Sequence, residues 1–338
     1  MISQYYRYPD GTLPNTAAMA FTLLGYPLGI ALLVQPFWLA KAAGFLLVTL
    51  TLIWSAYFIH EYAHQAIFKT AEANARWGTI MTWINGSCYA KFADLRRKHM
   101  RHHVERADVI TFHVQGFLHK GPAWLRKLVL ALEWAYIPAV EFIMHAYVMA
   151  LPFIKPSADK SRTRIVVIFM VRTAAFAALA WYSLSALVLY AIAYVVFITV
   201  LRFADCFQHT YDAYPILDES PIPNDKVRDR AYEQANTYSN VVGIDNKWLN
   251  MLWLNFGFHN AHHARPTIPW YRLPAFHREL YDAANSQVIP VRILLKSFHI
   301  NRVKRVLSAD YGQVLPPDVS GRADGFLGAV GVSFLTAI

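Results

Sequence analysis

The chain has 338 residues, of which 56% are hydrophobic and 16% are charged, and its formal net charge is +10. Average soluble domains are about 45–50% apolar and about 25% charged, so this composition excludes a disordered chain and argues against a soluble enzyme. A positive charge could suit nucleic acid, but the long uncharged runs favour a membrane protein with a basic face and no nucleic-acid partner. The only cysteines, Cys88 and Cys206, exclude a disulfide framework and a cysteine-ligated metal cluster.

Two long apolar runs predict two membrane-spanning hairpins. Residues 16–59 contain Lys41 as their only charge, and residues 165–201 contain only Arg172. Because a spanning helix needs about 20 residues, each run is long enough for two spans, and the first is interrupted near Pro36. The fold class is therefore predicted to be an all-α polytopic membrane protein. The predicted spans are residues 17–35, 40–59, 165–182 and 184–203.

The segment between the hairpins, residues 124–154, is apolar but carries periodic charge. That pattern fits a helix at the membrane interface better than a span. Residues 60–121 hold nine Lys and Arg, whereas the hairpin turns hold only Lys41. The positive-inside rule then places both termini and a helical cap, residues 60–123 and 204–338, in the cytosol. The whole chain, 1–338, is interpreted as one domain. Its predicted location is a bacterial inner membrane rather than the endoplasmic reticulum.

Nine of the fourteen histidines fall into four groups, two of which have the spacing HxxHH. In a helix, positions i, i+3 and i+4 share one face, with Cβ atoms about 5–6 Å apart. Nine imidazoles exceed the coordination of one ion and predict two metals, for which iron, zinc and copper are suitable. Iron is favoured because a redox-inert site would not need a buried approach from the bilayer. The predicted ligands are His60, His64, His99, His102, His103, His209, His259, His262 and His263.

The positions of these groups also restrict the topology. His60 follows the second predicted span and His209 follows the fourth. If residues 124–154 crossed the membrane once, these two histidines would lie on opposite sides. A shared metal site therefore requires that segment to be interfacial.

Two other interpretations of the histidines are weaker. Residues 60–64 have the pattern HExxH of zinc proteases, in which Glu61 would be the general base. A membrane zinc metalloprotease needs one further ligand and would leave both HxxHH groups without a role. A metal-binding transporter should carry ionisable residues within its spans. Apart from Lys41 and Arg202 at the span ends, the only charged residue in the predicted spans is Arg172.

At these histidines the sequence resembles the membrane fatty acid desaturase and hydroxylase superfamily, which carries an HxxxH or HxxxxH box and two HxxHH boxes. Residues 258–273, FHNAHHARPTIPWYRL, resemble the third box of bacterial and plastid acyl desaturases, and the resemblance extends from Trp54 to Leu280. It implies a non-haem centre of two iron ions, O₂ as co-substrate and attack on a C–H bond of a fatty acyl chain. Desaturation is the expected outcome; a decarboxylase that forms terminal 1-alkenes and an acyl hydroxylase are the alternatives.

The resemblance also implies a separate electron donor, because no His-Pro-Gly-Gly of a fused cytochrome b5 domain is present. A carrier of the ferredoxin, rubredoxin or cytochrome b5 type, with its reductase, would supply the electrons. In stearoyl-CoA desaturases one histidine ligand also lies outside the boxes, as His209 does here. Those enzymes have an asparagine four residues earlier, where this chain has Asp205, which could bind a metal directly or hold a water.

Several further residues close to the boxes are candidates for supporting roles. Glu61 and Asn260 each follow a predicted ligand by one residue, so contact with a ligand or with solvent is expected rather than metal binding. Glu105 lies three residues after His102 and could orient it. The basic residues around the second box could dock an acidic carrier or an acyl head group, or could form a solvated cytosolic face. They are Lys91, Arg96, Arg97, Lys98 and Arg101. The other histidines are expected at the surface or interface; they are His113, His119, His145, His277 and His299.

Overall fold

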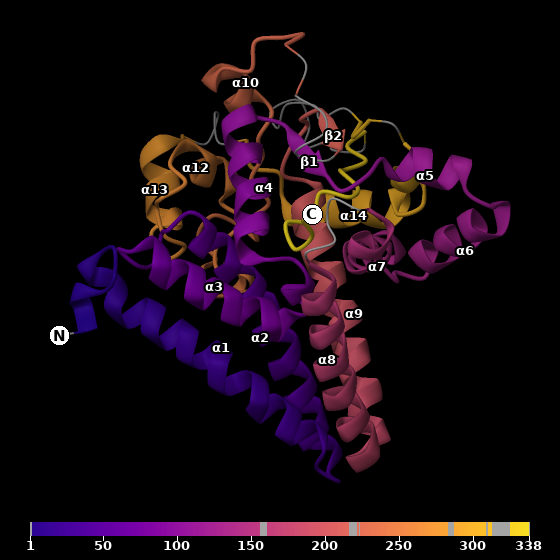
Figure 1. Ribbon diagram of the computed structural model, residues 1–338. Coiled ribbons are helices and arrows are strands. Elements are labelled where there is room, and N and C mark those ends of the chain that lie inside the picture. Colours follow the sequence, from indigo (N-terminus) through magenta and orange to yellow (C-terminus); the bar gives the residue numbers. More distant parts are fainter. Residues whose placement is uncertain are drawn as a thin grey trace. The chain divides into compact units, whose positions relative to one another are not determined.

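The computed structural model describes residues 2–155, 161–215, 222, 224–282, 287–308, 310–312 and 325–337. This part of the chain is mostly helical, with one sheet of two strands (Figure 1). It divides into two compact units. The first unit is Met1–Asp94, His145–Val200 and Leu335–Ile338, and the second is Leu95–Met144 and Leu201–Phe334.

The first unit is built from long helices. Three short 3₁₀ turns accompany them: η1 (Ile2–Gln4), η2 (Pro9–Gly11) and η3 (Ser87–Tyr89). Its helices are α1 (Thr12–Leu33), α2 (Trp38–Ala63), α3 (Ala71–Asn85), α8 (Arg162–Tyr182) and most of α9 (Leu184–Cys206).

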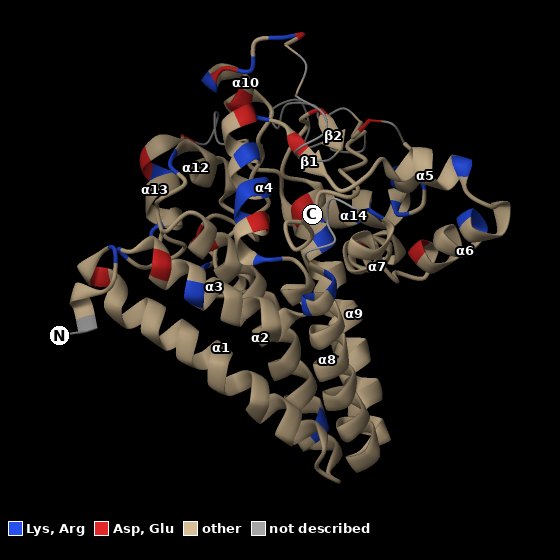
Figure 2. Cartoon of the chain, in the orientation of Figure 1, with Lys and Arg blue, Asp and Glu red and all other residues tan. Residues whose placement is uncertain are grey.

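Four of these helices are long and apolar enough to cross a membrane: Pro9–Leu33, Trp38–Ala63, Arg162–Tyr182 and Leu184–Cys206. They form two pairs, α1 with α2 and α8 with α9, and Figure 2 shows few charged residues along them. The four predicted spans fall on these four helices, so the prediction of a multi-pass all-α protein is confirmed.

Small residues allow α1 and α2 to approach closely. A Cβ atom on Gly29 would lie 2.8 Å from Val48 Cγ2, and one on Gly44 would lie 2.7 Å from the Gly29 carbonyl oxygen. Small residues at helix crossings are typical of membrane proteins, where close packing replaces the hydrophobic effect as the source of association. A larger residue at either position would force the two helices apart.

The second unit consists of shorter helices and two short strands. Its helices up to the fourth span are most of α4 (Phe92–Glu105), α5 (Val114–Lys120), α6 (Ala123–Trp134) and the start of α7 (Ala139–Ile154). Those that follow are α10 (Arg230–Ala235), α11 (Lys247–Asn250), η5 (Met251–Trp253), α12 (His259–Ala264), α13 (Leu273–Leu280), α14 (Val291–Asn301) and α15 (Lys304–Leu307).

The segment predicted to be interfacial forms two helices, α6 and α7, of 12 and 16 residues. Its acidic residues do not form a polar face. The carboxylates of Glu133 and Glu141 are buried and accept hydrogen bonds from the Arg202 guanidinium at 2.6 and 2.9 Å. The structure thus places these two acidic residues in a buried ion cluster, and the interfacial location of the segment remains a prediction.

Each of the two strands of the sheet follows one of the histidine groups along the chain. Strand β1 (Asp108–Ile110) follows α4, and strand β2 (Ala213–Pro215) follows His209. The strands pair in parallel, with Asp108 opposite Ala213, and the Asp108 amide donates to the Asp212 carbonyl at 2.9 Å. This pairing brings the end of α4 next to the chain that follows α9.

Candidate metal centre

Four histidines from three parts of the second unit converge on one point. The Nε2 atom of His209 lies 3.1 Å from Nε2 of His102 and 2.8 Å from Nε2 of His259. The ligand atoms of this group, which includes His263, all lie within 4.8 Å of one another. Nitrogen atoms bound to one ion at about 2.1 Å lie about 3 Å apart, so the spacing fits ligands of a single metal.

The opposite nitrogen of each of three rings faces an oxygen. His102 Nδ1 lies 2.9 Å from the Ala107 carbonyl and 3.3 Å from an Asp108 carboxylate oxygen. His209 Nδ1 lies 3.3 Å from Thr237 Oγ1. Such contacts place the ring proton on Nδ1 and leave the Nε2 lone pair for a metal.

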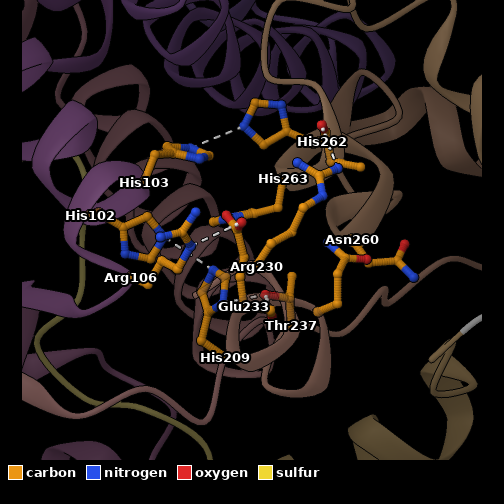
Figure 3. Close-up of polar contacts among 12 residues, drawn as sticks. His102, His103, Arg106, His209, Arg230, Glu233, Thr237, Asn260, His262 and His263 are labelled. Atoms are coloured by element: carbon orange, nitrogen blue, oxygen red, sulfur yellow. Dashed lines mark hydrogen bonds and ion pairs between the residues drawn. The ribbon is translucent and has the colours of Figure 1, made fainter. Parts of the chain in front are cut away.

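His263 has the strongest of these contacts, because its Nδ1 lies 3.0 Å from the buried Glu233 carboxylate (Figure 3). The second oxygen of Glu233 accepts from Arg106 at 3.2 Å. The backbone carbonyl of Glu233 accepts from the Thr237 hydroxyl at 2.7 Å, so one short helix, α10, supports both His263 and His209. Sequence reasoning missed Glu233, since it lies 30 residues from His263 and no local spacing connects them.

A second group in the same unit contains His99, His103 and His262. His99 and His103 lie one turn apart on α4, with their Nε2 atoms 3.1 Å apart, and Nε2 of His262 lies 3.2 Å from Nε2 of His103. The second and third boxes therefore each contribute to both groups, a division that the i, i+3, i+4 spacing alone does not predict.

The first box lies in the first unit, at the end of α2. The rings of His60 and His64 have centroids 4.8 Å apart, and both residues are buried. Glu61 is also buried, with a carboxylate oxygen 3.7 Å from His60 Nδ1. Participation of His60 and His64 in one centre with the other histidines remains a prediction.

The buried histidine rings of the two groups are in the neutral state that metal ligands require. Burial lowers the pKa of His99, His209, His259 and His263 well below the usual value, and neighbouring imidazoles lower it further. Burial, with His102 beside it, also lowers the pKa of His262 to about 3. The rings are thus neutral at pH 7, as metal ligands must be. Lone pairs that face one another at about 3 Å repel, so a cation between them would stabilise the arrangement.

A small cavity of about 40 Å³ adjoins the histidines. Its wall includes Asp205, the last residue but one of α9, which lies four residues before His209. Among the described residues, the compact groups of potential ligand atoms contain no atom of Asp205. Asp205 thus borders the cavity, and metal ligation by it remains a prediction.

Lys98 corrects one part of the sequence interpretation. It was expected on a basic face that is either solvated or docks an acidic carrier or an acyl head group. Its side chain is instead buried in the cavity wall, and Nζ donates to the Ser333 carbonyl at 2.8 Å. Burial lowers the pKa of Lys98 to about 7, although the Asp108 and Asp205 carboxylates oppose this shift. The reason is helical geometry, because Lys98 lies four residues before His102 and shares its face.

The other candidates have the following environments. Glu105 forms an ion pair with Arg101 on the same helix, and the oxygen atoms next to His102 Nδ1 belong to Ala107 and Asp108 instead. Asn260 is buried, and its side-chain oxygen accepts from the Ser239 hydroxyl and the Ala261 amide. It therefore fixes the start of α12, which carries the third box.

His277 differs from expectation, because it is only 1% exposed rather than at the surface. Its ring lies 5.3 Å from that of Phe258, and burial, followed by the charge of Arg278, lowers its pKa to about 4. His277 is therefore a neutral core residue that packs against Phe258, the residue before α12.

Four helices that can cross a membrane and buried histidine clusters that can hold metal are features of the membrane metalloproteins, and this chain has both. A search against protein-family models identifies the fatty acid desaturase family over residues 36–294, and the chain therefore belongs to that family. Its members are oxidoreductases that typically use two irons, and the histidine clusters are consistent with such a site. Searches of curated proteins and of solved structures returned no match.

Proposed function

We propose that this protein inserts a double bond into a fatty acyl chain with O₂ and a di-iron centre. The observation that carries the proposal is the convergence of histidine Nε2 atoms at 2.8–3.2 Å within the region that matches the family. The family implies a fatty acyl substrate and an oxidative reaction. Desaturation is the named reaction of this family and is the outcome we expect.

The ligand count supports two irons. One ion is assigned His102, His209, His259 and His263, and the other His99, His103 and His262. Three imidazoles leave the second ion short of the coordination common for iron, and His60 and His64 are the remaining box histidines. We therefore assign these two residues to the second ion, on the basis of the box pattern and the ligand count.

The bound irons would activate O₂ with two electrons from a separate carrier of the ferredoxin, rubredoxin or cytochrome b5 type. Overall, two hydrogens leave adjacent methylenes, and with two electrons and two protons one O₂ becomes two waters. The residues of the chain orient the ligands: Glu233 and Thr237 fix His263 and His209, while Ala107 and Asp108 fix His102. Fixed ligand rings keep the reacting centre in one geometry during turnover.

Product analysis tests the reaction. Cells that express the protein would be given isotope-labelled saturated acids, and their lipids and volatile products would be analysed by mass spectrometry. We expect labelled acyl chains lighter by two hydrogens. Terminal 1-alkenes one carbon shorter would identify a decarboxylase, and hydroxy acids would identify a hydroxylase; either result would replace the proposed reaction.

Metal analysis of the purified protein tests the centre independently. We expect about two irons per chain, because the predicted ligands exceed the needs of one ion. A single zinc, together with cleavage of a membrane peptide, would instead support the HExxH protease based on Glu61.

Orientation in the membrane is a further part of the proposal. We assign both termini and the histidine boxes to the cytosol, because residues 60–121 hold nine Lys and Arg and the hairpin turns hold only Lys41. Reporter fusions that fluoresce only in the cytosol, placed at residue 338 and in the turn near Ser183, provide the test. Fluorescence from the turn but not from the C-terminus would overturn the assignment.

A further inference from the structure

The C-terminal tail, which we define as residues Phe326–Phe334, lies outside the family match, which ends at residue 294. It is nevertheless part of the core of the second unit. Phe326 is fully buried, and Ala329, Val330 and Phe334 are 2%, 6% and 9% exposed. A terminal segment without regular secondary structure is usually poorly ordered unless it is tied down, so specific contacts must hold this one.

Backbone contacts supply that attachment. The Ala329 amide donates to the Cys206 carbonyl at the end of α9 at 2.7 Å, and Lys98 Nζ donates to the Ser333 carbonyl at 2.8 Å. Gly328 has φ +83°, and a Cβ there would lie 2.9 Å from the Cys206 carbonyl oxygen. Glycine is therefore required where the tail crosses α9.

The tail reaches the cavity beside the metal centre. Val332 and Phe334 line this cavity together with His99, His102, His209 and His259. The Phe334 ring lies 6.2 Å from the Phe256 ring, which in turn lies 5.1 Å from the His259 ring. Two residues that the family match does not include thus form part of the surface that faces the predicted ligands.

The size and lining of the cavity indicate what it can hold. A volume of about 40 Å³ corresponds to a few water-sized molecules, since one water needs at least about 10–15 Å³. It is too small for an acyl chain. Its wall has a polar part with Asp108, Asp205 and Gln208, and an apolar part to which the tail contributes.

We propose that the C-terminal tail closes the metal cavity against bulk water, with Val332 and Phe334 as the closing residues. The proposal rests on the function proposed above. A limited volume beside the irons keeps water and small chelating molecules from the ligands. It also favours the use of O₂ in acyl oxidation over its release as hydrogen peroxide, which consumes two carrier electrons and two protons per O₂.

Paired substitutions within the tail test this role. Phe334→Ala and Val332→Ala shorten residues that line the cavity, whereas Phe326→Ala and Val330→Ala shorten buried residues of the same tail that pack elsewhere. Each pair removes the same atoms, so loss of stability alone should affect both members. Phe334→Leu is included as a milder variant.

The first measurement is the rate at which a chelator removes iron from the purified holoprotein, and it requires no acyl oxidation. We expect about tenfold faster removal for Phe334→Ala, a smaller increase for Val332→Ala, and rates close to wild type for the two controls. Equal rates in both members of each pair would overturn the proposal.

The second measurement is the ratio of hydrogen peroxide to oxidised acyl product. We expect the ratio to rise for Phe334→Ala, with Phe334→Leu between it and wild type. Unchanged chelation and an unchanged ratio would refute the closing role while the wild type still oxidises acyl chains. An absence of acyl product from wild type, together with faster chelation in Phe334→Ala, would refute the proposed function alone.

Discussion

The carboxylate of Glu233 provides a direct test of how the metal ligands are oriented. In the substitution Glu233→Gln, the side chain keeps its length and an oxygen that can accept from His263 Nδ1, but loses its negative charge. Glu233→Ala removes the acceptor as well. If the 3.0 Å contact with His263 sets the tautomer and basicity of that ring, metal affinity should fall in both variants, and more in the second.

The magnitude follows from the geometry around Glu233. Loss of an outer partner of a ligating histidine typically costs 10–100-fold in metal affinity or activity. Glu233→Gln retains a neutral hydrogen bond, so we expect a loss of about tenfold, or about 1.4 kcal/mol. Glu233→Ala also deprives Arg106 of its 3.2 Å partner and frees the His263 ring, so we expect about 100-fold.

Competition titration measures the affinity. The apoprotein is titrated with Co²⁺ against a chelator of known affinity, and the absorption of bound Co²⁺ reports both stoichiometry and environment. Glu105→Gln is the matched control, because Glu105 pairs with Arg101, while the oxygen atoms next to His102 Nδ1 belong to Ala107 and Asp108. Affinity for Co²⁺ that is unchanged in Glu233→Ala would refute the reasoning.

Three further predictions concern the centre and its support. His209→Ala should reduce iron from about two to about one per chain, measured by elemental analysis, because His209 contacts two other ligands of its group; retention of two would contradict the assignment. Arg202→Met should destabilise the protein by about 3–5 kcal/mol in detergent denaturation, because it leaves Glu133 and Glu141 buried without their cation; a change below 1 kcal/mol would count against the buried cluster. Burial, opposed by Arg202 and assisted by Glu133, raises the pKa of Glu141 from 4.5 to about 7, so its contribution to stability should be complete below pH 4.5 and decline as pH rises to about 7. Thermal denaturation from pH 5 to 8 should show a shallower decline in Glu141→Gln, and identical slopes would contradict this.

The features that could be predicted from sequence are those encoded locally. The four spans follow from two apolar runs with one charged residue each, because each run is about twice as long as the 20 or so residues that one spanning helix needs. The proximity of the imidazoles within each HxxHH box follows from helical spacing, because positions i, i+3 and i+4 share one face of a helix. These signals need no knowledge of the path of the chain.

The contacts that could not be predicted depend on that path. Glu233 reaches His263 because α10 packs against α12, and no local pattern specifies this contact between helices distant in the sequence. The position of Lys98 could have been inferred, since it is one turn from His102, but its location in a run of basic residues favoured the solvated interpretation. The burial of Glu133 and Glu141 depends on Arg202, a partner distant in sequence.

The third box lies on a helix of only six residues, α12. Isolated helices of fewer than about 12 residues are marginal in water, and here Asn260 and Glu233 fix α12 through Ser239 and His263. One ligand group therefore needs residues 102, 209, 259 and 263 together. During synthesis, the emerging polypeptide lacks half of that group until residues beyond 258 have left the ribosome. Metal binding by the complete group would consequently be a late step in biogenesis, after both hairpins have been synthesised.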